Sequence, residues 1–199
     1  MRVIVFGASG GTGRLVVRLG IGRDHEVTAF VRDASKQWFP DAVTIVQGDP
    51  RDGKAVEDAI AGNDAVISAL GPVAGVTVDE ISAATRAIAE AMERIGLGRI
   101  VVAANAKVFT DDEVTGPYAN VAVEHRRDVA LLRASGLDWT VVAAPSLTDD
   151  APMGSYDAAI DAKAIGRQIT RGDFALALLD ALDRTDWIRH VIGVTNPPD

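Results

Sequence analysis

Val3-Ile4-Val5-Phe6-Gly7-Ala8-Ser9-Gly10-Gly11-Thr12-Gly13-Arg14 joins a short apolar strand to a glycine-rich loop that opens a helix. In such a loop Gly7 permits a tight turn, Gly10 lets the backbone approach a pyrophosphate, and Gly13 lets the helix pack close to the strand. Free N–H groups and the positive end of the helix dipole would then face the anion. The position at a strand–helix junction favours dinucleotide binding over the alternative, a glycine-rich turn that binds nothing. No Gly-Lys-Ser/Thr follows, which disfavours a nucleoside-triphosphate loop.

Short runs rich in valine and isoleucine alternate along the chain with amphipathic segments of helical period. The runs lack apolar/polar alternation, as expected where helices cover both faces of a parallel sheet. We predict strands at Arg2–Phe6, Glu26–Val31, Val43–Val46, Ala65–Ser68, Arg99–Ala103, Trp139–Val142 and, as a last edge strand, Val191–Val194. We predict helices at Gly11–Leu19, Gly53–Ala61, Asp79–Ile95, Val121–Ala134 and Asp173–Leu182, and one or two short strands within Tyr156–Thr170. This order predicts a doubly wound α/β fold in a single domain over residues 1–199, with a small C-terminal region on the substrate side.

Composition narrows the class of protein. Of 199 residues, 48% are hydrophobic and 24% charged, the balance of a globular domain. The 20 basic and 28 acidic residues leave a net charge of −8, which disfavours a nucleic-acid partner. The lack of cysteine excludes disulfides and thiolate zinc sites, and no His/Asp/Glu grouping has the spacing of metal ligands. Without a secretory signal or a bilayer-length apolar segment, we expect a cytoplasmic protein that stays out of the membrane, as a monomer or small homo-oligomer.

Cofactor choice in such folds is made at the end of the second strand, about 20 residues after the glycine loop. Arg32 comes first after that strand, and a guanidinium can bind a 2′-phosphate bidentately and stack on adenine. Asp33 is the alternative, as an acid that binds an unphosphorylated ribose. Arg14, at the start of the first helix, offers a second cation. We therefore favour NADP(H) as the cofactor.

Two further loops follow strands at the same edge of the predicted sheet. Gln47-Gly48-Asp49 fits either a contact with the adenine edge or a plain turn, and Ser68-Ala69-Leu70-Gly71-Pro72 is a small-residue loop that would pass beneath the cofactor. Ser9 and Thr12 add hydroxyl donors to the first loop. From the residues alone, we expect the cofactor to be bound by Gly7, Ser9, Gly10, Gly11, Thr12, Gly13, Arg14, Arg32, Asp49, Leu70 and Gly71.

The sequence resembles the atypical short-chain dehydrogenase/reductase group with NAD(P)-binding, NmrA-like domains, in particular its flavin reductase/biliverdin-IXβ reductase type. The resemblance spans nearly the whole chain and rests on Gly7-Ala8-Ser9-Gly10-Gly11-Thr12-Gly13, Val31-Arg32-Asp33-Ala34-Ser35-Lys36, Gly48-Asp49, Leu70-Gly71, Glu124-His125-Arg126-Arg127, Leu132-Arg133-Ala134-Ser135-Gly136-Leu137 and Ile169-Thr170-Arg171-Gly172-Asp173. It implies a Rossmann-like domain that binds NADPH at the carboxyl edge of the sheet. It also implies that Ala143-Ala144-Pro145-Ser146 lies beside the nicotinamide, with Ala144 and Pro145 on the cofactor and Ser146 on the substrate. An open, shallow pocket would let a flat ring stack there.

The usual acid of short-chain dehydrogenases is missing from the sequence. These enzymes use a tyrosine whose pKa is lowered by a lysine four residues later. Here the fourth residue after Tyr118 is Ala122, and the spacing of Lys107 does not reproduce the pair. Alcohol–ketone chemistry therefore lacks its proton donor, whereas a stacked flavin can take a hydride while solvent supplies the proton. Tyr118 is then expected to line the substrate pocket as an aromatic wall.

His125 is the candidate catalytic residue, because it matches a histidine of the flavin reductase type and an imidazole could hydrogen-bond the cofactor or substrate and relay a proton. The alternative is a surface histidine that caps a helix. The neighbouring Glu124, Arg126 and Arg127 read as a solvated face. Arg171-Gly172-Asp173 reads as a helix start capped by Asp173, a structural role.

Two functions remain open from the sequence. The first is an NADPH-dependent reductase that transfers hydride to a flavin or a similar flat acceptor. The alternative is a non-catalytic NADP(H)-binding regulator of the NmrA type, which senses the nucleotide and acts through a partner. The absence of the tyrosine–lysine pair is compatible with both the reductase and the regulator.

Overall fold

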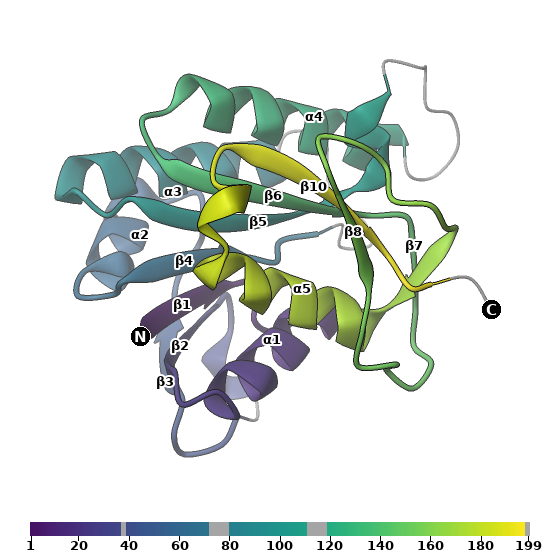
Figure 1. Ribbon diagram of the computed structural model, residues 1–199. Helices are drawn as coiled ribbons and strands as arrows, with labels where there is room; N and C mark the ends of the chain where they lie inside the picture. Colours follow the sequence, from purple (N-terminus) through teal and green to yellow (C-terminus); the bar gives the residue numbers. More distant parts are fainter. Residues whose placement is uncertain (37–38, 72–79, 111–118, 198–199) are drawn as a thin grey trace.

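The computed structural model describes residues 1–36, 39–71, 80–110 and 119–197 (Figure 1). Its main sheet has eight strands in the order β3-β2-β1-β4-β5-β6-β10-β8, and each neighbouring pair is parallel except β10 with β8. The strands are β1 (Arg2–Phe6), β2 (Glu26–Val31), β3 (Thr44–Gln47), β4 (Ala65–Ser68), β5 (Arg99–Asn105), β6 (Asp138–Ala144), β8 (Asp157–Ile160) and β10 (His190–Thr195). The predicted doubly wound α/β fold is confirmed.

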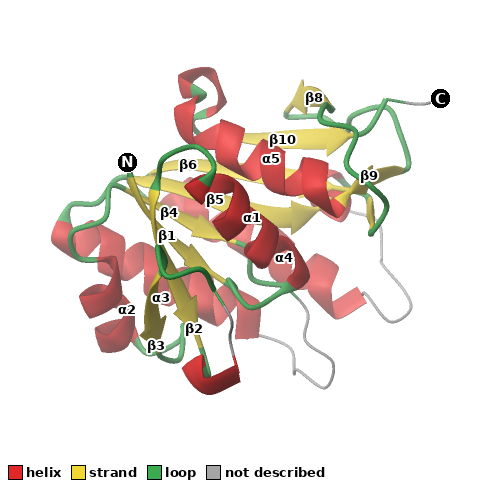
Figure 2. Ribbon diagram, turned by 90° about the horizontal axis from the view of Figure 1, so that it is seen from below, coloured by secondary structure: helices red, strands yellow, loops and turns green. Residues whose placement is uncertain are grey.

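Helices cover both faces of the sheet. In the described residues these are α1 (Gly11–Ile21), α2 (Gly53–Ile60), α3 (Glu80–Ile95), α4 (Ala119–Ala134) and α5 (Arg171–Asp183). Helices α1 and α5 lie side by side on one face, and α2, α3 and α4 cover the other (Figures 1 and 2). Each face therefore has its own hydrophobic core.

The first strand shows why the strands read as continuous apolar runs. Val3 and Val5 point into the core under α1 and α5, whereas Ile4 and Phe6 point into the core under α2, α3 and α4. All four side chains are buried. Because successive side chains of a strand face opposite ways, a sheet that is covered on both sides needs apolar residues at every position.

The C-terminal region corrects one prediction and confirms another, the two short strands within Tyr156–Thr170. The strand predicted at Val191–Val194 is not at the edge: β10 pairs with both β6 and β8, and β8 forms the edge. The second short strand of this region, β9 (Gln168–Thr170), pairs with β7 (Ser146–Thr148) in a separate two-stranded sheet.

The start of α5 also differs from the prediction. Its N-cap is Thr170, whose hydroxyl oxygen accepts a hydrogen bond from the Asp173 backbone N–H at 3.0 Å. The Asp173 carboxylate is fully buried and instead accepts bonds from the backbone N–H groups of Met153 and Gly154. Asp173 thus ties the chain before β8 to α5 rather than capping the helix.

Within the described residues, no helix has the length and apolar character needed to cross a bilayer. In the same residues, no cluster of three or more His, Asp or Glu side chains could hold a metal ion.

Candidate dinucleotide site

A cavity of about 1020 Å³ lies at the carboxyl ends of the parallel strands. It is lined by the residues that follow β1, β2, β4, β5 and β6, together with the first residues of α1 and α5. The strand order reverses between β1 and β4, and open α/β sheets bind their ligands in the crevice at this switch point. We call this space the switch-point cavity.

The glycine loop at one end of the cavity has the backbone that its sequence predicts. Gly7 has φ +74°, and a Cβ there would lie 2.6 Å from the carbonyl oxygen of Ala69. A Cβ on Gly13 would collide with the carbonyl oxygen of Gly7, so Gly13 serves the contact between helix and strand. Gly10 is the N-cap of α1 and brings no side-chain acceptor, which leaves first-turn amides of the helix for a ligand.

The two candidates for cofactor choice, Arg32 and Asp33, have different surroundings. Arg32 lines the switch-point cavity and makes no hydrogen bond or ion pair to another described residue. The Asp33 carboxylate is engaged in its own turn, where it accepts from the Ser35 hydroxyl at 2.6 Å and pairs with Lys36 at 2.9 Å. Lys36 and Ser35 together lower the pKa of Asp33 to about 2. This arrangement leaves Arg32, and not Asp33, at the wall of the cavity.

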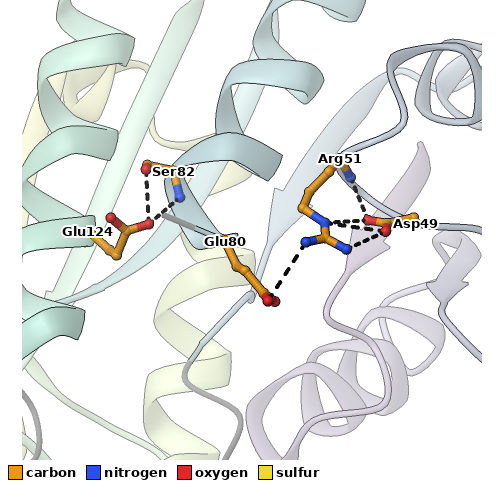
Figure 3. A network of polar contacts seen from close by, with 5 residues as sticks. All are labelled: Asp49, Arg51, Glu80, Ser82 and Glu124. Atoms are coloured by element: carbon orange, nitrogen blue, oxygen red, sulfur yellow. Dashed lines mark hydrogen bonds and ion pairs between the residues drawn. The ribbon is translucent and has the colours of Figure 1, made fainter. Parts of the chain in front are cut away.

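Asp49 belongs to a chain of charges on the cavity wall (Figure 3). Its carboxylate accepts from the Arg51 guanidinium at 2.6 and 2.9 Å, and Arg51 in turn lies 3.7 Å from Glu80. The hydrogen bonds from Arg51 lower the pKa of Asp49 to about 2. Arg51 and Glu80 could not be recognised from the sequence as neighbours, because their proximity depends on α3 lying beside the loop after β3.

Small residues form the floor at the other end of the cavity. Ala103, Ala104 and Asn105 come from the end of β5, and the segment 143–146 comes from the end of β6 and the turn that follows it. Side chains this short leave room for a flat ring to approach the strand ends.

His125 lies beside this floor, on α4. The Asn105 backbone N–H donates to its Nδ1 at 3.0 Å, and the side chain is 5% exposed. Burial lowers the pKa of His125 to about 4, so the imidazole is neutral at physiological pH. Since Nδ1 accepts, the ring proton sits on Nε2, which has no partner among the described residues. The alternative of a surface histidine that caps a helix is therefore wrong.

Of the three neighbours of His125 that the sequence assigned to a solvated face, Arg127 is exposed, Arg126 is partly buried and Glu124 is buried. The Glu124 carboxylate is buried and accepts from both the backbone N–H and the hydroxyl of Ser82 at 2.9 Å (Figure 3). Burial opposes ionisation of Glu124, but the hydrogen bonds from Ser82 and Arg127 outweigh it and lower the pKa. Arg126 donates to the carbonyl oxygen of Lys107. These contacts join α4 to α3 and to the end of β5.

Most of the expected site residues meet at the switch-point cavity. Those that line it are Gly7, Ser9, Gly10, Gly11, Thr12, Arg32, Asp49, Leu70, Gly71, His125, Ala144, Pro145 and Ser146. Gly13 and Arg14 do not line it; the Arg14 guanidinium donates to the carbonyl oxygen of Ser9 at 3.0 Å. Tyr118 lies outside the described residues. Arg171, which the sequence assigned to a structural helix start, does line the cavity.

Comparison with known proteins gives the family. Residues 7–185 match a family model described as NAD(P)H-binding, and the chain belongs to that family. YwnB of Bacillus subtilis (strain 168) is 28% identical over 205 residues, covering 94% of each chain.

Solved structures share the fold. SP1627 of Streptococcus pneumoniae TIGR4, named as a proposed NADH-flavin reductase, superposes with a TM-score of 0.81 at 24% identity, covering 99% of this chain and 100% of that one. ChuY, an anaerobillin reductase from Escherichia coli O157:H7, gives 0.84 at 20% identity, covering 100% and 98%. The protein is thus a member of an NAD(P)H-binding family, and it shares the Rossmann fold of these structures.

Proposed function

We propose that the protein is an NADPH-dependent reductase that transfers hydride to a flavin or a similar flat conjugated acceptor. The observation that carries the proposal is the switch-point cavity, which joins a phosphate-binding loop at one end to a floor of small residues at the other. The glycine loop fits a pyrophosphate, because a Cβ would be excluded at Gly7 and Gly13 and the N-cap residue Gly10 has no side chain to accept from the first amides of α1.

Arg32 supports NADPH over NADH. Arg32 lines the cavity wall and makes no ion pair or hydrogen bond with another residue that the structure describes, whereas the Asp33 carboxylate is bound to Ser35 and Lys36. An unpaired arginine can bind a 2′-phosphate bidentately, whereas an acid that is already hydrogen-bonded is a poor ligand for a ribose hydroxyl.

The floor of the cavity supports a flat acceptor. When bound, NADPH would supply a hydride from its nicotinamide, the acceptor would be reduced, and the accompanying proton would come from solvent. The chain contributes position: Ala144 and Pro145 would support the nicotinamide, and Ser146 would border the acceptor. Neither of the two tyrosines in the sequence is followed by a lysine at the fourth position, so no side-chain pair of the usual kind delivers a proton. The flavin and bilin reductases with the same fold have names consistent with this acceptor class.

His125 acts in this proposal as a hydrogen-bond donor rather than an acid. Its neutral ring is held through Nδ1 by the Asn105 N–H, so only Nε2–H remains to be offered. A donor at this place can orient a carbonyl of the acceptor or of the nicotinamide carboxamide.

The test is NADPH oxidation at 340 nm with FMN, riboflavin or a tetrapyrrole as acceptor. We expect turnover well above the rate in free solution, and NADPH preferred to NADH. The matched control is Arg18→Gln, which removes an exposed cation of α1 that does not line the cavity and should keep the preference for NADPH. Nucleotide binding without turnover of any flavin, quinone or tetrapyrrole would contradict the reductase proposal.

That negative result would favour the second candidate, an NADP(H)-sensing regulatory protein. It is supported by the same missing tyrosine–lysine pair. A sensor must change a surface when the nucleotide binds, so it should show altered hydrogen exchange on NADPH binding without net consumption of the nucleotide.

A further inference from the structure

Arg171 reaches the glycine loop from the other end of the chain. It is the first residue of α5, and α5 lies beside α1 (Figures 1 and 2). Its guanidinium nitrogen is 3.5 Å from the Thr12 hydroxyl oxygen, although 159 residues separate the two. A Cβ on Gly11 would lie 3.1 Å from both Cδ and Nε of Arg171. Gly11 therefore leaves the space through which the Arg171 side chain crosses the loop.

The charge environment of Arg171 is suited to an anion. The first turn of α1 contains no acidic residue, and its N-cap Gly10 contributes no side-chain oxygen. Arg171 has one acidic partner among the described residues, Asp149, whose carboxylate accepts from Nε at 2.7 Å. The Nη1 of Arg171 lies near the Thr12 hydroxyl, and Arg171 lines the cavity. Although the net charge of the chain is −8, the Arg171 guanidinium and the positive end of the α1 dipole lie together at the glycine loop.

The ion pair with Asp149 does not by itself explain why the arginine is here. The Asp149 side chain is 79% exposed, and exposed ion pairs contribute little to stability. A weak, solvent-exposed pair can hold a guanidinium in place and release it to a stronger acceptor at little cost. Phosphate is such an acceptor, because it matches the planar fork of arginine bidentately.

We propose that Arg171 is a phosphate ligand of the bound dinucleotide, closing over the pyrophosphate from the side opposite the amides of the glycine loop. This inference rests on the proposed use of the switch-point cavity for NADP(H). It gives the two arginines of the cavity separate tasks. Arg32 binds the 2′-phosphate, which NADH lacks, and Arg171 binds the pyrophosphate, which both nucleotides share.

The experiment is isothermal titration calorimetry of the full chain with NADPH, NADH and ADP-ribose. ADP-ribose keeps the pyrophosphate but lacks both the nicotinamide and the 2′-phosphate. Arg171→Gln should weaken all three ligands by a similar factor of about 10 or more. Arg171→Lys, which keeps the charge but loses the bidentate fork, should weaken all three to a smaller degree.

Asp149→Asn is the matched control, because it breaks the same ion pair without removing the cation. It should bind all three ligands at least as tightly as the wild type, since it removes a negative charge near the phosphates. The proposal is overturned if Arg171→Gln binds within twofold of the wild type, if Asp149→Asn loses as much affinity as Arg171→Gln, or if only NADPH is weakened. Should Arg171→Gln not fold, Arg171→Lys with wild-type affinity for all three ligands would overturn it equally. The readout is binding, so a protein that binds the nucleotide but reduces no flavin would fail the proposed function and still pass this test.

Discussion

Replacing Asp128 with asparagine should stabilise the protein, and the gain should grow with pH. The Asp128 side chain is fully buried on α4, between that helix and α3, and neither carboxylate oxygen has a hydrogen-bond partner within the described residues. Burial raises the pKa of Asp128 from 3.8 to about 7, and the Glu124 carboxylate adds to the rise. Thr85 lies close enough to offset part of it, although the two side chains make no hydrogen bond of good geometry.

The size of the effect follows from this pKa. In the unfolded chain the carboxyl ionises near pH 3.8, whereas in the folded protein it holds its proton up to about pH 7. Above pH 3.8 the folded state thus binds more protons than the unfolded state, and stability falls as pH rises. Between pH 3.8 and about pH 7, each pH unit lowers the free energy of unfolding by about 1.4 kcal/mol. The total loss is therefore about 4 kcal/mol near pH 7 and stays constant above it. Asparagine does not ionise and escapes this loss.

The assay is urea unfolding of the wild type and Asp128→Asn at several pH values from 4 to 8. The variant's advantage in free energy of unfolding should rise by about 1.4 kcal/mol per pH unit up to about pH 7. Thr44→Ser, which exchanges two residues that do not ionise at an exposed position, is the control and should show a difference that does not change with pH. An Asp128→Asn difference that is equally independent of pH would refute the argument that this carboxyl is kept protonated by burial.

Three other predictions concern the cavity. Arg32→Glu should weaken NADPH by about 100-fold and NADH by less than threefold in calorimetric titrations, and equal losses would disprove recognition of the 2′-phosphate. His125→Ala should lower kcat/KM for flavin reduction. Because the pKa of His125 is about 4, the wild-type rate should lose the contribution of this group only as the pH falls below about 5. A loss centred near pH 6.5 would instead indicate an ordinary, exposed histidine. Gly13→Ala should lower the free energy of unfolding in urea by about 3 kcal/mol, because its Cβ meets the Gly7 carbonyl oxygen. Gly71→Ala, whose Cβ would meet no atom of the described residues within 4 Å, should lower it by less than about 1 kcal/mol, and similar losses would contradict the packing argument.

The fold could be predicted from the sequence because its signals are local. The glycine loop after β1 and the continuous apolar runs each reflect a short stretch of chain with its own periodicity. The position of β10 could not be predicted, since whether a strand lies at an edge depends on its neighbours. The edge strand β8 (Asp157–Ile160) has the sequence Asp-Ala-Ala-Ile, which contains only one β-branched residue and therefore gives a weak strand signal. Only the pairing in three dimensions places it there.

The site divides in the same way. Residues in the loops directly after β1, β2 and β4 were predictable, because the carboxyl ends of parallel strands meet at one edge. The burial of Glu124 and His125 was not, since their partners, Ser82 and Asn105, come from other elements. Arg171 was missed because a helix start has the same local sequence whether or not it lies against another helix.

The most direct test of the account is isothermal titration calorimetry of the purified protein with NADPH and with NADH. We predict one nucleotide bound per chain and tighter binding of NADPH. If neither nucleotide binds to folded protein, the switch-point cavity does not hold a dinucleotide, and the functions proposed from it are wrong.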